Sequence, residues 1–172
     1  AKIIHKSGKR LNETLNSILD LSKIESQKLD LKQNSIELVT MVQECKYVFS
    51  DTVNKKGLKF SVSSDQEKVF IKSDQNIVHK ILCNIIDNAV KYTNEGSVTI
   101  NLSETTENVT IKVTDTGIGI PKENLNQIFE SFRQGSEGLN RKFEGMGIGL
   151  TITRKYVEIL GGKLTVESDF GK

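Results

Sequence analysis

The sequence predicts an α+β fold, a two-layer sandwich in which helices cover a mixed, mostly antiparallel sheet, preceded by one long helix. Three observations support this prediction. In several segments apolar residues recur every three or four positions, which is the period of a helix. Other segments alternate apolar and polar residues and come in pairs joined by short turns, which is typical of antiparallel strands. Helices and strand pairs follow one another irregularly, whereas a parallel doubly wound sheet needs strands and helices to alternate.

Size and charge narrow the class of protein. The 172 residues are enough for one domain with a core and a short appendage. Lys and Arg total 24 against 22 Asp and Glu, and a net charge of +2 is too small to indicate a nucleic-acid binder or a membrane-surface binder. No apolar run is long enough to cross a bilayer, so we expect a soluble, cytoplasmic chain. Because the chain begins within a helical pattern and ends after a predicted strand, we also expect a fragment of a longer protein.

The first predicted element is a helix over residues 4–29 with one narrow apolar seam. A seam of this kind needs a partner helix, supplied by missing sequence or by another subunit. The alternative is that the helix folds back onto the domain that follows. The seam consists of Ile4, Leu11, Leu15, Ile18, Leu21 and Ile24.

The remaining elements follow in order. Ser35 is predicted to cap a second helix that ends at Gly57, and Asp74 to cap a third, broadly apolar helix. The two cysteines are predicted to be ordinary core thiols, because no Cys or His was found at metal-ligand spacing around them. Two hairpins are predicted, one from residues 59–63 and 69–72 and one from 97–104 and 108–115. The last elements are a helix over 148–160 and a strand over 163–168.

The third helix carries a polar stripe. Asn84, Asn88 and Lys91 are four and three residues apart and therefore project from one side of the helix. Amide oxygens suit a magnesium ion, which prefers oxygen ligands and shares its shell with phosphates, and Lys91 could neutralise a phosphate oxygen. The alternative is that these side chains only face water.

Two glycine-bearing segments accompany this helix. Asp115 follows a strand directly and is placed to accept a hydrogen bond from an adenine amine, while Gly117 and Gly119 allow a flat ring to approach the backbone. The alternative for this segment is a plain turn. Residues 145–150 lie where a loop enters a helix, a position that attracts phosphate. Their G-x-G-x-G spacing excludes the dinucleotide fingerprint, and the chain has no P-loop motif.

A fourth segment lies between these glycine segments. Phe129 and Phe132 are three residues apart and could anchor a short helix, which would leave Arg133 able to reach a terminal phosphate. The alternative is an exposed arginine in a loop. The triplet at residues 169–171 matches a protein-kinase metal motif, but the chain lacks the catalytic loop that accompanies that motif, so we assign it no role.

Taken together, the four segments resemble the ATP-binding catalytic domain of sensor histidine kinases, within the gyrase, chaperone and mismatch-repair ATPase superfamily. Residues 84–93 match the asparagine box of this family, 115–120 the first glycine box, 129–133 the phenylalanine box and 145–150 the second glycine box. Residues 19–26 resemble part of the second helix of the family's dimerisation hairpin. The resemblance covers nearly the whole chain and implies the Bergerat-type ATP-binding fold.

The resemblance also implies cofactors, domains and site residues. We expect ATP and Mg²⁺, with Asn88 and Asn84 holding the metal, and Asn84, Lys91 and Arg133 serving catalysis. Residues 1–31 would be the second hairpin helix and 32–172 the catalytic domain, which lacks its last strand. The expected nucleotide-binding residues are Asn84, Asn88, Lys91, Tyr92, Asp115, Gly117, Gly119, Ile120, Phe129, Phe132, Arg133, Gly145, Gly147, Ile148, Gly149, Leu150 and Thr151.

The implied reaction is transfer of the ATP γ-phosphoryl group to a histidine, for relay to a response-regulator receiver domain. Hydrolysing relatives usually carry a glutamate where this chain has Asn84, which favours transfer over hydrolysis. The acceptor histidine box is absent, and we interpret His5 and His79 as structural or surface residues. In the intact protein we expect a homodimer through the helical hairpin, no direct membrane contact by this chain, and a cytoplasmic location even if the parent is membrane-anchored. The alternatives are a nucleotide-gated dimerisation or scaffold module and a hydrolysing ATPase.

Overall fold

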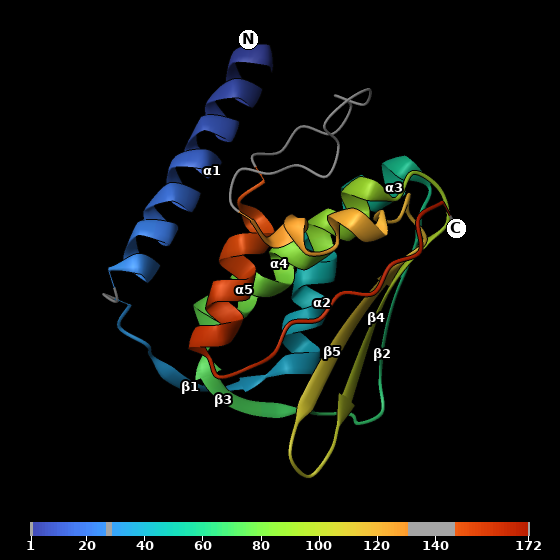
Figure 1. Cartoon of the computed structure of the whole chain (residues 1–172). Helices are drawn as coiled ribbons and strands as arrows, with labels where there is room; N and C mark the ends of the chain where they lie inside the picture. Colours follow the sequence, from blue (N-terminus) through green and yellow to red (C-terminus); the bar gives the residue numbers. More distant parts are fainter. Residues whose placement is uncertain (1, 27–28, 131–146, 172) are drawn as a thin grey trace. The chain divides into compact units, whose positions relative to one another are not determined.

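The computed structural model describes residues 2–26, 29–130 and 147–171 (Figure 1). The chain divides into two compact units. The helical unit comprises residues 1–30 and 126–164, and the sandwich unit comprises residues 31–125 and 165–172. The predicted domain boundary after residue 31 stays a prediction. The helical unit contains α1 (Lys2–Glu25), η2 (Gln127–Phe129) and α5 (Gly149–Ile159); the sandwich unit contains β1 (Gln33–Glu37), α2 (Leu38–Val48), α3 (Ser50–Lys56), β2 (Lys59–Ser64), β3 (Phe70–Asp74), α4 (Gln75–Tyr92), β4 (Ser97–Glu104), β5 (Val109–Asp115) and η1 (Lys122–Asn124).

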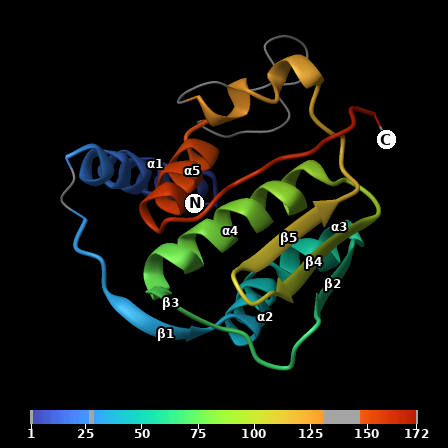
Figure 2. The same ribbon diagram turned by 60° about the horizontal axis from the view of Figure 1, so that its bottom comes forward.

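The sandwich unit has a mixed three-stranded sheet in the order β2-β4-β5. β2 runs parallel to β4, with Lys59 opposite Ser97, and β4 runs antiparallel to β5, with Val98 opposite Asp115. A second, two-stranded antiparallel sheet pairs β1 with β3. Helices α2 and α4 lie side by side on one face of the three-stranded sheet (Figure 2). The predicted α+β sandwich with a mixed sheet is therefore confirmed.

The core of the sandwich unit lies between this sheet and its two helices. Val98, Ile100 and Leu102 alternate along β4 and are buried, as the pleat of a strand with one covered face requires. The opposite face is polar: Ser61 Oγ donates a hydrogen bond to Thr99 Oγ1 (3.2 Å). The helices contribute Leu38, Met41, Val42, Cys45, Ile77, Val78, Leu82, Ile86, Ala89 and Val90.

The first predicted hairpin is wrong. β2 and β3 belong to different sheets, because β2 pairs with β4 and β3 pairs with β1. The sequence missed β1, a short strand in which only Ile36 is buried, so its apolar alternation is too weak to recognise. Ser35 accordingly does not cap a helix; it lies within β1, opposite Lys72.

Two carboxylates cap α2 and α4 in the sandwich unit. Glu37 caps α2 by accepting hydrogen bonds from the backbone N–H groups of Val39 (3.0 Å) and Thr40 (2.8 Å). Asp74 caps α4 as predicted, with bonds from Asn76 N (3.0 Å) and Ile77 N (3.1 Å). Both caps satisfy backbone donors that the first turn of a helix leaves unpaired.

The predicted second helix is in fact two helices. Phe49 ends α2 and begins α3. At this break Ser50 Oγ donates a hydrogen bond to Tyr47 O (2.7 Å), and such side-chain bonds to nearby backbone groups compete with the hydrogen bonds of a helix. Gly57 ends α3 with φ = 67°, the left-handed conformation that glycine adopts without strain, so the predicted end is confirmed.

The last two predicted elements differ in outcome. The helix over 148–160 is confirmed as α5. The strand over 163–168 is wrong, because these residues form no strand in the structure. An alternating pattern alone does not make a strand when no neighbouring strand supplies a hydrogen-bond ladder.

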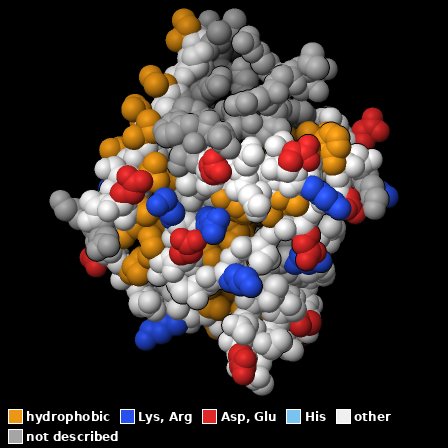
Figure 3. Space-filling view, in the orientation of Figure 1, with side chains coloured by type: hydrophobic (Ala, Val, Ile, Leu, Met, Phe, Trp, Pro, Cys, Tyr) orange, Lys and Arg blue, Asp and Glu red, His pale blue; other side chains and the backbone are white. Residues whose placement is uncertain are grey.

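In the helical unit, α1 packs against α5 near its C-terminal end, where Ile24 is buried. Other apolar side chains of α1 gather along its surface (Figure 3). The exposed fraction of these side chains runs from 77% for Ile4 through 60% for Leu11 and 50% for Leu15 to 43% for Ile18. Most of the predicted seam is therefore left uncovered in the single chain.

Candidate functional site

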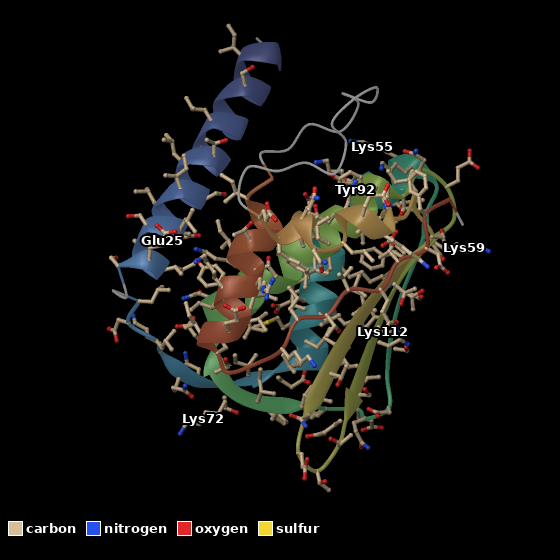
Figure 4. All side chains as sticks on the ribbon, in the orientation of Figure 1. Glu25, Lys55, Lys59, Lys72, Tyr92 and Lys112 are labelled. Atoms are coloured by element: carbon tan, nitrogen blue, oxygen red, sulfur yellow. The ribbon has the colours of Figure 1, made fainter. Side chains whose placement is uncertain are left out.

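The polar stripe of α4 lies where the helical period predicts. Asn84, Asn88 and Lys91 are half-buried, on the opposite side of the helix from the buried Leu82 and Ile86. Lys91 Nζ lies 5.0 Å from the centroid of the Tyr92 ring, at the C-terminal end of α4 (Figure 4). The stripe therefore presents two amide side chains and one ammonium group from successive turns.

The C-terminal end of α4 is held by a lysine that the sequence analysis did not single out. Lys56 Nζ donates hydrogen bonds to the carbonyl oxygens of Val90 (2.8 Å), Lys91 (3.0 Å) and Thr93 (2.9 Å). A helix leaves its last carbonyls without partners, and a cation at this end also interacts favourably with the helix dipole. Lys56 therefore fixes the backbone of the residues that carry Lys91 and Tyr92. Its only sequence signal is its place just before Gly57, at the end of α3.

Asp115 is joined to this helix end. Its Oδ1 accepts hydrogen bonds from Gly117 N (2.9 Å) and, more weakly, from Thr93 Oγ1 (3.5 Å). Ile118 N donates to Tyr92 O (3.3 Å). Thr93 is fully buried, and its single hydroxyl proton is shared between Ala89 O (2.7 Å), the shorter contact, and Asp115 Oδ1, so it ties the last turn of α4 to the end of β5. The structure thus brings together two of the predicted segments, the end of the asparagine box and the first glycine box.

The turn needs glycine at positions 117 and 119 because other atoms of the chain lie where a Cβ would stand. A Cβ on Gly117 would lie 2.6 Å from Tyr92 O and 2.7 Å from Asp115 Oδ1. Gly119 has φ = 70°, and a Cβ there would collide with Asp169 O and lie 2.9 Å from Phe170 Cα. No side chain fits at either position without moving the backbone.

The chain segment at residues 168–171 lies against this turn. Ile120 N donates to Ser168 Oγ (2.8 Å), and Gly171 N donates to Ile118 O (3.2 Å). The sequence analysis gave the triplet at 169–171 no role, and its resemblance to a kinase metal motif did not point to this contact. These residues act as a backbone support for the glycine turn.

The helical unit holds the other predicted residues that the structure describes. Gly147 has φ = 68°, Ile148 is buried, and α5 begins at Gly149, so the second glycine segment does enter a helix. Thr151 Oγ1 donates to Phe129 O (2.8 Å).

Arg154 also holds the phenylalanine segment in place, because its guanidinium lies 5.3 Å from the centre of the Phe129 ring. The start of α5 and the described part of the phenylalanine segment are thus joined within the helical unit. Leu150 is half-buried on α5. Phe132, Arg133 and Gly145 lie outside the described residues. The prediction that these residues and those of the sandwich unit bind one nucleotide stays a prediction.

Two hollows on the described part of the surface do not coincide with these residues. One of about 340 Å³ lies in the sandwich unit and is lined by residues of α2, α3 and β2, with Leu58. Another of about 330 Å³ in the helical unit is lined by Ile24, Lys155, Glu158 and Ile159. Neither contains a predicted site residue. A polar nucleotide site that is open to solvent need not be a closed, apolar cavity.

Comparison with known proteins decides the family. The family described as histidine kinase-, DNA gyrase B-, and HSP90-like ATPase matches residues 73–172, more than half of the chain. The chain belongs to this ATPase family. The matched span includes α4, the Asp115 turn and α5, which are the elements that carry the predicted boxes.

Curated relatives with similar sequences include sensor kinases and histidine kinases. Autoinducer 2 sensor kinase/phosphatase LuxQ of Vibrio cholerae is 36% identical over 174 residues, which cover 98% of this chain and 20% of the relative. Hybrid signal transduction histidine kinase B of Dictyostelium discoideum is 34% identical over 171 residues, covering 96% and 9%. The chain thus spans a fifth or less of the length of these curated relatives. The resemblance to the ATP-binding catalytic domain of sensor histidine kinases is confirmed.

Solved structures agree with this assignment. Full-length ShkA in complex with AMPPNP superposes with a TM-score of 0.86 at 25% identity, covering 97% of this chain and 35% of that one. Histidine kinase ThkA in complex with the response regulator TrrA gives a TM-score of 0.73 at 25% identity, covering 93% and 43%. ATP binding is therefore supported for this member of the ATPase family. Within the described residues, no helix combines the length and the apolar character that a membrane crossing needs.

Proposed function

We propose that this chain is the phosphoryl-donor part of a protein histidine kinase, which binds ATP with Mg²⁺ and transfers the γ-phosphoryl group to a histidine. The observation that carries the proposal is the Asp115 turn, which Thr93 and Ile118 join to the end of α4 and which the Gly117 N–H closes on Asp115. These bonds hold a carboxylate at the end of β5, beside backbone that only glycine can occupy.

The adenine end of the site is assigned to Asp115. Among the described residues, its hydrogen bonds use Oδ1, and no donor reaches Oδ2. We assign Oδ2 to the adenine amine, with Gly117, Gly119 and Ile120 giving the ring a flat backbone surface. Tyr92 completes this end from the last turn of α4.

The residues present fit a magnesium ion. Asn84 and Asn88 offer two amide oxygens one helical turn apart, and Mg²⁺ takes oxygen ligands while keeping phosphate oxygens and waters in its shell. When bound, the ion would neutralise charge on the phosphates. Lys91, one turn further along, is placed to neutralise a phosphate oxygen.

In the helical unit, the start of α5 is proposed to bind phosphate through the backbone N–H groups that follow Gly147. The first turn of a helix has unpaired N–H groups and a partial positive charge, both of which favour anions. Thr151 and Phe129 hold this start in place through their hydrogen bond. We keep Phe132, Arg133 and Gly145 in the proposal on the family resemblance alone.

The proposed acceptor chemistry follows from Asn84. This chain has an amide where a hydrolysing relative usually has a glutamate to activate water, so positioning and charge stabilisation serve transfer to a protein histidine. From that histidine the phosphoryl group would pass to a response-regulator receiver domain. The exposed seam of α1 supports a homodimer in the intact protein. We place the chain in the cytoplasm, where ATP and such regulators are found.

Nucleotide binding tests the site. Asp115→Ala and Asn88→Ala should each weaken binding of an ATP analogue with Mg²⁺ by about 10- to 150-fold, because each removes a polar contact worth about 1.5–3 kcal/mol. Titration calorimetry measures the affinity. Asn76→Ala is the matched control, since Asn76 is an exposed asparagine in the first turn of the same helix. Binding by Asp115→Ala and Asn88→Ala at parental affinity would refute the site.

Phosphoryl transfer tests the reaction. The chain is mixed with γ-labelled ATP, Mg²⁺ and a separate protein that carries an acceptor hairpin histidine. Label should appear on that histidine, and Asn88→Ala should abolish it. Nucleotide binding without transfer would reject the kinase in favour of a scaffold, and steady phosphate release without labelled histidine would indicate a hydrolase.

A further inference from the structure

Three side chains with metal-binding atoms meet where α2 contacts α4. Cys45 comes from α2, and His79 and Cys83 come from α4. Cys45 Sγ lies 3.9 Å from Cys83 Sγ, and Cys83 Sγ lies 3.7 Å from both ring nitrogens of His79. One ligand atom from each residue lies within 4.8 Å of the other two. Cys45 is fully buried, while His79 and Cys83 are half-buried.

The positions of these three residues on their helices explain why their side chains lie close together. His79 and Cys83 are four residues apart on α4 and therefore share one side of it. Cys45 continues the buried face of α2, and this face packs against α4. The prediction of core thiols without a ligand partner overlooked His79, which lies four residues before Cys83. The signal was the four-residue spacing of His79 and Cys83, which pairs with Cys45 only in the fold.

Two of the three separations, those from Cys83 Sγ to Cys45 and to His79, match those between the ligands of a tetrahedral metal, and Cys45 and His79 lie within 4.8 Å of each other. With Zn–S near 2.3 Å and Zn–N near 2.0–2.1 Å, tetrahedral angles place two sulfurs about 3.8 Å apart and a sulfur and a nitrogen about 3.6 Å apart. The observed 3.9 Å and 3.7 Å differ from these values by about 0.1 Å. Both ring nitrogens of His79 lie at the same distance from Cys83 Sγ, so either could serve as the ligand atom.

We propose that Cys45, His79 and Cys83 bind one zinc ion, with water in the fourth position. Two thiolates and an imidazole form a ligand set that suits Zn²⁺, and magnesium prefers oxygen ligands instead. On binding, each thiol releases its proton to solvent and forms a Zn–S bond, and His79 binds as neutral imidazole. The half-buried side of the cluster gives water and the ion access.

A disulfide explains the cluster less well. An S–S bond is about 2.05 Å long, so the sulfurs would have to move almost 2 Å closer together. A disulfide also assigns no part to His79, although its ring lies as close to Cys83 as Cys45 does.

The ion would link α2 to α4, two helices that otherwise pack against each other. Cys83 directly precedes Asn84, so α4 would carry a zinc ligand beside a proposed magnesium ligand. An ion that binds only the folded chain stabilises it by mass action. The thermal midpoint should therefore rise when zinc is added.

Metal titration tests the proposal on the reduced, metal-free chain. Zn²⁺ is measured by competition with a chromophoric chelator, and Co²⁺ substitution by its thiolate charge-transfer absorption. We expect one ion per chain and a raised thermal midpoint. Cys45→Ser, Cys83→Ser and His79→Gln should each weaken binding by at least about tenfold, because even the loss of an outer partner of a ligand costs that much.

Control variants show whether zinc binding depends on these three residues. His5→Gln removes the chain's only other histidine and should bind zinc as the parent does, as should Asn88→Ala. If the buried Cys45→Ser does not fold, the half-buried His79→Gln and protection of Cys83 from alkylation by Zn²⁺ decide the matter. Absence of stoichiometric uptake would overturn the proposal, as would parental affinity in Cys83→Ser and His79→Gln.

Discussion

At the residue scale, Lys56 is a single side chain on which three backbone carbonyls depend. Lys56→Met keeps the length of the side chain and removes all three hydrogen bonds. We expect the free energy of unfolding to fall by about 2 kcal/mol, since hydrogen bonds to charged groups contribute about 1.5–3 kcal/mol. Denaturant unfolding measures the change.

Lys55 provides the matched control for this prediction. It is the neighbouring lysine on α3 and is exposed, so Lys55→Met removes the same charge without touching the end of α4 (Figure 4). We expect a change within about 0.5 kcal/mol for this variant. If both variants unfolded at the same denaturant concentration, Lys56 would not be the cap that its contacts indicate.

Gly117 gives a second prediction at this scale. In Gly117→Ala the new methyl group would push Tyr92 O and Asp115 Oδ1 apart, so ATP-analogue affinity should fall at least tenfold and stability should fall by about 1–3 kcal/mol. Calorimetry and thermal unfolding measure the two effects. Gly8→Ala is the control: no atom lies within 4 Å of a Cβ there, and alanine in the interior of α1 should stabilise by about 0.5–1 kcal/mol.

At the scale of elements, α1 carries the prediction about assembly. If its exposed seam pairs with a second copy, the chain should self-associate as its concentration rises, and Leu15→Asp should abolish this association by burying a charge in the contact. Analytical ultracentrifugation measures the mass. Asn16→Asp adds the same charge to the exposed next position and should leave association unchanged. A monomer at every concentration would contradict the seam's proposed role.

The sequence predicted where helices and strands lie better than it predicted which strands pair. Periodicity located α4, β4 and α5, because each has one buried face, and β5, whose half-buried and exposed residues alternate. It did not reveal that β2 pairs with β4, since pairing depends on which strands the helices bring together. The short β1, with one buried residue, gave too little pattern to detect.

In the candidate site too, features that depend on local sequence were predicted and features that depend on distant contacts were not. The sequence predicted Asn88 and Asp115 as site residues from local patterns, because spacing on a helix and position after a strand are both local. Lys56 and the cysteine cluster remained unrecognised, because their partners lie more than 30 residues away in the sequence. Chemistry that depends on long-range contacts could be found only in the fold.

At the scale of the whole molecule, two helix caps make stability depend on pH. The hydrogen bond from the Thr40 hydroxyl is the largest of the causes that lower the pKa of Glu37 to about 2. Hydrogen bonds from backbone N–H groups also lower this pKa, and together these bonds outweigh burial, which raises it. Burial raises the pKa of Asp74, but hydrogen bonds from Lys32, Ile77 and Asn76 backbone N–H groups outweigh it, so this pKa also lies below its ordinary value.

The sign follows from proton binding. Both carboxyls bind protons more weakly in the folded state, so their stabilisation is complete above the unfolded values of 4.5 and 3.8 and is lost as pH falls through the lowered pKa. We expect their contribution to stay constant between about pH 7 and pH 6 and to decline below about pH 4.5. Urea unfolding at several pH values measures this.

Glu37→Gln isolates one cap. This variant should be less stable than the parent at pH 7, by about 1 kcal/mol as for other lost caps, and the difference should shrink toward pH 2. Glu44→Gln removes a carboxylate from an exposed position of the same helix and is the control. An equal stability difference at pH 7 and pH 2.5 would show that Glu37 ionisation does not stabilise the cap.

The hydrogen bonds that residues 168–171 make to the glycine turn bear on how the protein is made. Ser168 lies 48 residues after Ile120, and closing a long loop costs chain entropy before the contact is gained. While the ribosome is still adding residues, the Asp115 turn can form its bonds to α4 but lacks the Ser168 and Gly171 bonds. The turn therefore matures only after residue 171 has been made, and a nascent chain should acquire its nucleotide affinity only after residues 168–171 have emerged from the ribosome.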